Sequence, residues 1–80
     1  MRLICTHCGE VDDAYISMDR YPWVVSVHGG RLMAELSDDA QSREHARRLT
    51  LKQKCDIHDR VIRSEVFDCF CGEVGCVSVG

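Results

Sequence analysis

The clearest pattern along the chain is an alternation of inward and outward positions between residues 22 and 36. Every second residue is apolar within each of two runs, Trp23, Val25 and Val27 in the first and Leu32, Ala34 and Leu36 in the second. Gly29-Gly30 separates the two runs. Two alternating runs around two glycines predict a β-hairpin, because glycine readily adopts the positive φ of the favoured two-residue turns. We therefore expect a hairpin over 22–36 with Trp23 in the core.

A helix is predicted directly after this hairpin. Ser37-Asp38-Asp39 offers a capping side chain followed by acidic residues, a combination that favours a helix start. The helix would run to about Leu49, but its apolar face is thin, so we expect it to lie on the surface of a sheet. Residues 49–53 fit either the end of this helix or the start of a strand.

Further strands are expected where short runs of β-forming residues occur. Residues 2–8 predict a strand that enters a turn, residues 61–70 predict a second strand, and residues 76–79 predict a third. No repeat, low-complexity tract or linker interrupts the sequence, so residues 1–80 are expected to form one domain. Strand content should exceed helix content.

The six cysteines change this picture, because a chain of 80 residues has only a small core. Below about 70–80 residues a core alone rarely supplies more than ~3–5 kcal/mol, and disulfides or metal usually supplement it. No apolar run of signal-peptide length follows Met1-Arg2, and no segment approaches the ~20 apolar residues of a membrane span. We therefore expect a cytoplasmic protein with no membrane attachment, whose reduced thiols bind metal; three disulfides are the alternative.

The first candidate metal-binding element is Cys5-Thr6-His7-Cys8-Gly9. Two thiolates separated by two residues can hold one ion from a tight turn, and the following glycine lets backbone amides approach the sulfurs. The motif resembles the knuckle of zinc ribbons and rubredoxins. Cys-x-x-Cys also serves thioredoxin-type redox sites, but there it opens a helix within a larger α/β domain, and this sequence has no such pattern.

A second element, at the C-terminal end, has the form C-x-C-G-x-x-x-C. In a strand Cys69 and Cys71 point the same way, and the glycines that follow allow Cys76 to return to the same ion. The motif resembles the post-SET segment of histone methyltransferases, in which three such cysteines share a zinc with a fourth from elsewhere. The resemblance implies that these three cysteines can bind one ion together, and it implies nothing about methyl transfer.

The candidate ligands allow two arrangements. With one site, Cys5 and Cys8 join two of the three C-terminal cysteines, and Cys55 and His58 are a buried thiol and a surface histidine. With two sites, Cys55 and His58 form a Cys-x-x-His pair that completes a Cys₃His set with Cys5 and Cys8. The three C-terminal cysteines then hold a second ion. One site is expected and the second remains an alternative.

Zinc is the expected metal, because it suits closed sites of thiolate and imidazole, whereas an iron–sulfur cluster is the alternative for four cysteines. A bound structural zinc would contribute folding free energy on the order of 10 kcal/mol. The predicted fold is therefore a small metal-stabilised α+β domain, built of β-hairpins in a zinc-ribbon-like arrangement with one surface helix.

The charge of the chain is uneven around a net value of −3. One strip between residues 43 and 54 is basic and consists of Arg43, Arg47, Arg48, Lys52 and Lys54. An acidic chain with one basic strip is a poor general binder of nucleic acid, although the strip can contact phosphate locally. Nucleic-acid binding through this strip is therefore an alternative function.

The preferred function is a non-enzymatic adaptor or regulator that binds a protein partner. Zinc-ribbon-like proteins of this size accompany the machinery of transcription, translation and nucleic-acid processing, and viral or mobile-element regulators are built similarly, so these are the expected settings. The sequence contains no convincing general base, since Glu73 is expected to be a solvated turn residue, and no Gly-rich phosphate loop. An iron–sulfur or redox protein is the other alternative.

Overall fold

The computed structural model describes residues 1–18 and 20–80 as an α+β fold of two antiparallel sheets and two helices. In chain order the elements are β1 (Leu3–Cys5), β2 (Gly9–Val11), β3 (Asp13–Met18), β4 (Tyr21–His28), β5 (Arg31–Leu36), α1 (Ala40–Arg48), α2 (Leu51–Arg63), β6 (Val66–Phe67) and β7 (Val77–Val79). Strand residues outnumber helical residues, as predicted.

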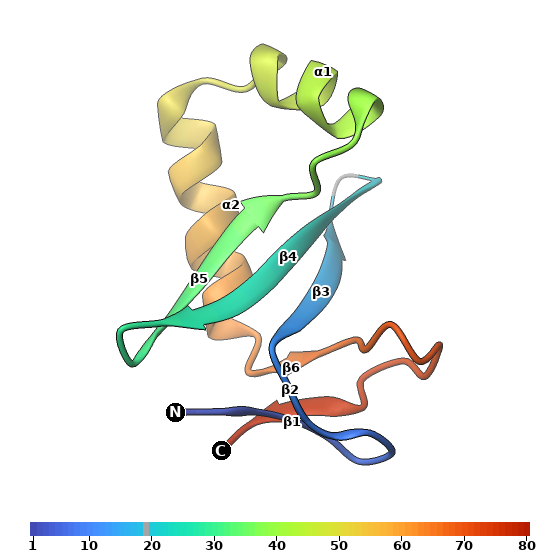
Figure 1. Cartoon of the computed structure of the whole chain (residues 1–80). Coiled ribbons are helices and arrows are strands. Elements are labelled where there is room, and N and C mark those ends of the chain that lie inside the picture. The colour runs from blue at the N-terminus through green and yellow to red at the C-terminus, as the bar shows by residue number, and fades with distance from the viewer. Residues whose placement is uncertain (19) are drawn as a thin grey trace.

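The two ends of the chain lie side by side in one of the sheets, which we call the terminal sheet (Figure 1). Its strand order is β2-β1-β7-β6, so the first and last strands of the chain are neighbours. Arg2 and Gly80 extend this pairing, because each backbone N–H donates to the other residue's carbonyl, at 3.0 and 2.8 Å. The predicted strands at residues 2–8 and 76–79 are thus confirmed as partners.

The second sheet, which we call the central sheet, contains β3, β4 and β5. Its β4–β5 hairpin is the one predicted over 22–36, and both turn residues, Gly29 and Gly30, have positive φ, at 58° and 76°. Trp23 is only 4% exposed, which confirms its place in the core. Strand β3 was not predicted, because acidic residues precede it and its apolar alternation is short.

The two sheets are joined by one isolated β-bridge between Tyr15 of β3 and Asp68, which follows β6. Two backbone hydrogen bonds form this bridge, Tyr15 N to Asp68 O at 2.9 Å and Asp68 N to Tyr15 O at 2.8 Å. The bridge therefore ties the segment that carries the C-terminal cysteines to the central sheet.

The core beneath the helices is built from small side chains on adjacent strands. Ala14, Val25 and Ala34 are register neighbours across β3, β4 and β5, and each is at most 5% exposed. Helix α2 contributes Ile57 and Val61 to the same buried cluster, and these residues are four apart on one helix face. The small residues allow this helix to lie close to the sheet.

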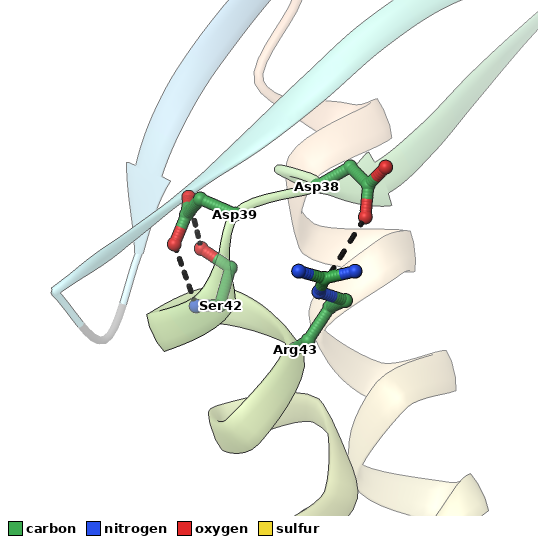
Figure 2. Close-up of polar contacts among 4 residues, drawn as sticks. All are labelled: Asp38, Asp39, Ser42 and Arg43. Atoms are coloured by element: carbon green, nitrogen blue, oxygen red, sulfur yellow. Dashed lines mark hydrogen bonds and ion pairs between the residues drawn. The ribbon is translucent and has the colours of Figure 1, made fainter.

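Helix α1 begins close to the predicted start, but its cap is Asp39 instead of a residue that precedes the two acids, so no acidic residue lies in its first turn. The Asp39 side chain caps it by accepting hydrogen bonds from the backbone N–H and the hydroxyl of Ser42, at 2.8 and 2.9 Å (Figure 2). These two bonds hold the pKa of the Asp39 carboxyl below its usual value, because they stabilise the charged form. The neighbouring Asp38 makes only a long, exposed contact with Arg43, at 3.8 Å.

Helix α2 corrects two predictions. The sequence was expected to contain one surface helix and a strand over 61–70, but residues 51–63 form a second helix and only Val66–Phe67 form a strand. The β-forming residues Val61 and Ile62 gave the wrong prediction, because their burial against the sheet outweighs their local preference. Within the described residues, neither helix is long and apolar enough to cross a membrane.

The start of α2 carries a sequence signal that was overlooked. Thr50 and Gln53 form a reciprocal capping box, in which Thr50 N donates to Gln53 Oε1 at 2.8 Å and Gln53 N donates to Thr50 Oγ1 at 3.1 Å. The spacing Thr-x-x-Gln is the usual signature of this motif. It resolves the ambiguity over residues 49–53, because the chain ends one helix there and starts another.

We expect Thr50→Ala to lower the free energy of unfolding by about 1 kcal/mol, because it removes the side-chain half of the capping box. Thr50→Ser keeps the hydroxyl and is the matched control, with an expected change within about 0.5 kcal/mol. Urea-induced unfolding followed by the fluorescence of Trp23, the single tryptophan, measures both values. Equal stabilities of the two variants would contradict the role of the cap.

Candidate metal centre

Strand β1 and the turn after it position the first two cysteines. Cys5 is the last residue of β1 and is 2% exposed, because it shares the buried face of the strand with Leu3. The chain then turns so that Cys5 pairs with Gly9. Gly9 has a φ of 81°, which glycine adopts readily and other residues adopt rarely. The backbone N–H of His7 donates to Cys5 Sγ at 3.4 Å. Cys8 lies in the turn and is exposed.

The segment between β6 and β7 positions the remaining cysteines of the cluster. The β-bridge at Asp68 fixes its start, and Cys69 is buried directly after it. The Asp68 carboxylate accepts a hydrogen bond from the backbone N–H of Gly75 at 2.7 Å, which folds the loop back on itself. Gly72 and Gly75 have positive φ, at 98° and 67°, so the loop can curl at both points.

Four sulfurs from the two ends of the chain meet at one point. The Sγ atoms of Cys5, Cys8, Cys69 and Cys71 all lie within 4.8 Å of one another. Cys5 Sγ is 3.9 Å from Cys71 Sγ, and Cys8 Sγ is 3.9 Å from Cys69 Sγ. A tetrahedral ion with metal–sulfur bonds of about 2.3 Å requires sulfur–sulfur separations of about 3.8 Å. The four sulfurs can therefore coordinate one metal ion.

None of these contacts is a disulfide. A disulfide bond is only about 2.05 Å long, whereas the closest of the sulfur pairs here is 3.6 Å apart. All six cysteines are free thiols in the structure.

Cys76 adds a fifth sulfur to the cluster. Its Sγ lies 3.6 Å from Cys5 Sγ and 3.9 Å from Cys71 Sγ, and its side chain is buried, with 6% of the residue exposed. Its thiol also lies 3.4 Å from the backbone carbonyl oxygen of Glu73, to which it donates a hydrogen bond. A tetrahedral ion takes four ligands, so the cluster holds one sulfur more than such an ion requires.

The sulfurs perturb one another strongly when no cation neutralises them. The pKa of Cys5 falls to about 6, chiefly because the backbone N–H of Cys8 stabilises its thiolate. The pKa of Cys8 rises to about 12, chiefly because of the adjacent Cys5 sulfur, and burial raises the pKa of Cys76 to about 12. The thiolate form is thus favoured at Cys5 and disfavoured at Cys8 and Cys76, and a bound cation would favour the thiolate form of a ligand.

The structure brings together the ligands of the one-site arrangement. Cys55 and His58 do not join Cys5 and Cys8, since the group of closely spaced ligand side chains found within residues 1–18 and 20–80 consists of Cys5, Cys8, Cys69 and Cys71. Both residues lie on α2, where His58 is partly exposed. Cys55 is exposed, not buried as the one-site arrangement assumed.

Cys55 and His58 line a separate hollow between the helices and the central sheet. The hollow has a volume of about 490 Å³. Its buried or half-buried apolar lining consists of Trp23, Ala34, Leu36 and Ala46. Its polar lining consists of Glu35, Lys54, Cys55, His58 and Asp59. The Nδ1 atom of His58 lies 3.5 Å from an Asp59 carboxylate oxygen. The sequence offered no signal for this hollow, because its walls come from β4, β5 and both helices.

The basic strip lies on α1 and the first turn of α2. Arg47 and Arg48 contact the carboxylate of Glu44 at 3.5 and 3.7 Å, and Arg43 contacts Asp38 at 3.8 Å. All these side chains are more than half exposed, so the pairs contribute little to stability. They do neutralise part of the positive charge of the strip.

Comparison with protein-family models, with curated protein sequences and with solved structures gives no match to this chain. The metal centre is therefore characterised by its own geometry. Its four sulfurs come from residues 5–8 and 69–71. Figure 1 shows the turn after β1 and the loop before β7 on the same side of the terminal sheet.

We expect the protein as purified to carry one metal ion per chain, and Cys69→Ser to abolish this, because it removes a buried ligand. Cys8→Ser, at an exposed ligand, should also lose the ion while disturbing the core less. Cys55→Ser is the matched control and should keep one ion per chain. Native mass spectrometry gives the metal content, and circular dichroism gives the folded fraction. Equal metal content in all variants would contradict the assignment.

Proposed function

We propose that the protein is a small zinc-stabilised, non-enzymatic adaptor that binds another protein. The observation that carries the proposal is the set of four cysteine sulfurs within 4.8 Å of one another, two from each end of the chain. Four thiolates fill the coordination sphere of a tetrahedral zinc and leave no open position for water or substrate. A site of this kind stabilises a fold and performs no reaction.

A single tetrahedral ion such as zinc is favoured over an iron–sulfur cluster by the spacing of the sulfurs. A separation of 3.9 Å in two independent pairs matches one tetrahedral ion. A cluster of several irons would hold its four thiolates farther apart, because each iron binds its own ligands. A single iron bound by four thiolates has the same geometry as zinc, and its visible absorption would distinguish it.

The metal has a clear structural task in this proposal. Strands β1 and β7 each contain three residues, and so short a pair is marginal without further support. An ion bound across the two ends would contribute folding free energy on the order of 10 kcal/mol. Metal binding would thereby replace the larger core that a chain of 80 residues lacks.

The hollow between the helices and the central sheet is the proposed binding surface. Its apolar lining is suited to an apolar side chain, and its volume of about 490 Å³ lies within the range of known ligand pockets. Two carboxylates, Glu35 and Asp59, surround it together with one ammonium group, Lys54. This charge balance favours a partner segment in which a basic residue lies next to the apolar one.

Nucleic-acid binding through the basic strip is less well supported. Three of its five basic residues already contact carboxylates, and the net charge of the chain is −3. Both features weaken attraction to phosphate, which depends on unneutralised Lys and Arg. The settings suggested by zinc-ribbon-like architecture, which are transcription, translation, nucleic-acid processing and viral or mobile-element regulation, remain compatible with a protein-binding role.

We expect a displayed peptide library to yield binders that combine an apolar residue with a neighbouring Lys or Arg. Binding should quench or shift the fluorescence of Trp23, which lines the hollow. Ala46→Glu places a charge in the hollow and should weaken the selected peptides at least about tenfold, since burying an unpaired charge costs more than 1.4 kcal/mol. Ala40→Glu, on an exposed position of the same helix outside the hollow, is the matched control.

Two results would contradict this function. Peptides that bind the wild type and Ala46→Glu equally would place the binding surface elsewhere. Salt-dependent binding of duplex DNA or RNA that is lost in Arg43→Glu/Lys52→Glu, with no selected peptide, would favour the nucleic-acid alternative. The zinc content of every variant, measured in parallel, shows whether the fold is intact in each comparison.

A further inference from the structure

The metal centre contains five sulfurs for four coordination positions. Cys5 lies at its middle, with the Sγ atoms of Cys71 and Cys76 at 3.9 and 3.6 Å. Cys71 and Cys76 are themselves 3.9 Å apart. Because a tetrahedral ion bound by Cys5, Cys8, Cys69 and Cys71 is complete, Cys76 is left as a thiol in direct contact with a bound ligand.

The hydrogen bonds of the sulfurs support this assignment. Cys5 Sγ accepts a hydrogen bond from the backbone N–H of His7 at 3.4 Å, as a metal-bound thiolate does. Cys76 Sγ instead lies 3.4 Å from the carbonyl oxygen of Glu73. A carbonyl oxygen repels a thiolate and accepts a hydrogen bond from a thiol. The contact with the Glu73 carbonyl and the completeness of the four-sulfur set both favour Cys76 as the sulfur that stays outside the coordination sphere.

We propose that Cys71 and Cys76 form a peroxide-oxidisable dithiol at the edge of the metal centre. Cys8 and Cys71 are the exposed cysteines of the cluster and can meet a small oxidant, and Cys71 is the one that contacts the spare sulfur of Cys76, at 3.9 Å. Cys76 lies beside it within the same loop, in the position of a resolving thiol. Gly72, which has a positive φ, lies between them and lets the loop contract until the sulfurs bond.

The reaction proceeds in two balanced steps. The Cys71 thiolate attacks hydrogen peroxide, so that a sulfur–oxygen bond forms, the oxygen–oxygen bond breaks and hydroxide leaves. The Cys76 sulfur then attacks the resulting sulfenic acid, a sulfur–sulfur bond forms, and the thiol proton leaves with the hydroxyl group as water. The two cysteines lose two electrons in total, and peroxide is reduced. A dithiol reductant reverses the change.

Disulfide formation would remove one of the four metal ligands. This consequence rests on the proposed zinc binding, whereas the dithiol itself rests only on the positions of Cys71 and Cys76. With Cys71 oxidised, the ion keeps Cys5, Cys8 and Cys69, and its affinity falls because one thiolate is lost. Peroxide would thereby release the metal that holds the two ends of the chain together.

The test treats the full zinc-loaded chain with hydrogen peroxide and follows released zinc with a colorimetric chelator. Peptide mass spectrometry locates the oxidised residues. We expect the wild type to lose two hydrogens, to form a Cys71–Cys76 disulfide and to release its zinc, and dithiothreitol with added zinc to restore it. Cys76→Ser should keep one zinc before oxidation and then gain oxygen on Cys71 without a disulfide. Cys55→Ser is the control and should behave as the wild type does.

Three results would overturn the inference. Loss of zinc from untreated Cys76→Ser would make Cys76 a ligand and not the spare thiol. A disulfide between other cysteines, or oxygen adducts on Cys71 in the wild type without a disulfide, would remove the pairing. Failure of the zinc proposal is a separate outcome. A wild type that binds no zinc but forms the Cys71–Cys76 disulfide would contradict zinc binding and support the oxidisable dithiol.

Discussion

The whole fold depends on the meeting of cysteine sulfurs from the two ends of the chain. Cys5 and Cys8 come from the first turn, and Cys69 and Cys71 come from the last loop, so that one cluster closes almost the entire sequence into a ring. The strands that bring them together are only three residues long, and backbone hydrogen bonds between Arg2 and Gly80 at one end and from Thr6 to Cys76 at the other extend their pairing. Unscreened thiolates at these distances repel one another, and a cation turns the repulsion into attraction.

The centre acts on the rest of the molecule through the segment that follows β6. Asp68 pairs with Tyr15 of the central sheet through its backbone and holds Gly75 through its side chain. The same residue therefore links the cysteine loop to the sheet and sets the shape of the loop. Beyond it, helix α2 covers the small residues of the central sheet with Ile57 and Val61. The cysteine cluster lies beside the terminal sheet, whereas the apolar hollow lies between the helices and the central sheet.

This separation has a functional meaning. In the proposed function, a closed thiolate site stabilises the fold without offering a position for substrate, and the hollow is the surface for recognition. The fifth sulfur, Cys76, makes the stabilising end chemically labile, because a thiol in contact with a ligand can take that ligand away by oxidation. In the proposed picture, the oxidation state of two neighbouring cysteines decides whether the recognition surface is supported.

The sequence by itself determined the elements whose signals are local. Gly29-Gly30 between alternating runs specified the central hairpin, and Ser37-Asp38-Asp39 indicated the start of α1. Cys5-x-x-Cys8 and the C-terminal cysteines indicated a cluster that could hold a metal ion, but left open whether there were one or two sites. Helix α2 carried a local signal too, the Thr50–Gln53 capping box, but the β-branched residues near its end pointed to a strand. Only the tertiary structure decided that Val61 is buried in a helix, that Cys76 touches the cluster as a fifth sulfur, and that Cys55 and His58 face a hollow instead of an ion. The physical reason is that each of these outcomes depends on which distant segments come into contact, and spacing along the chain carries no record of that.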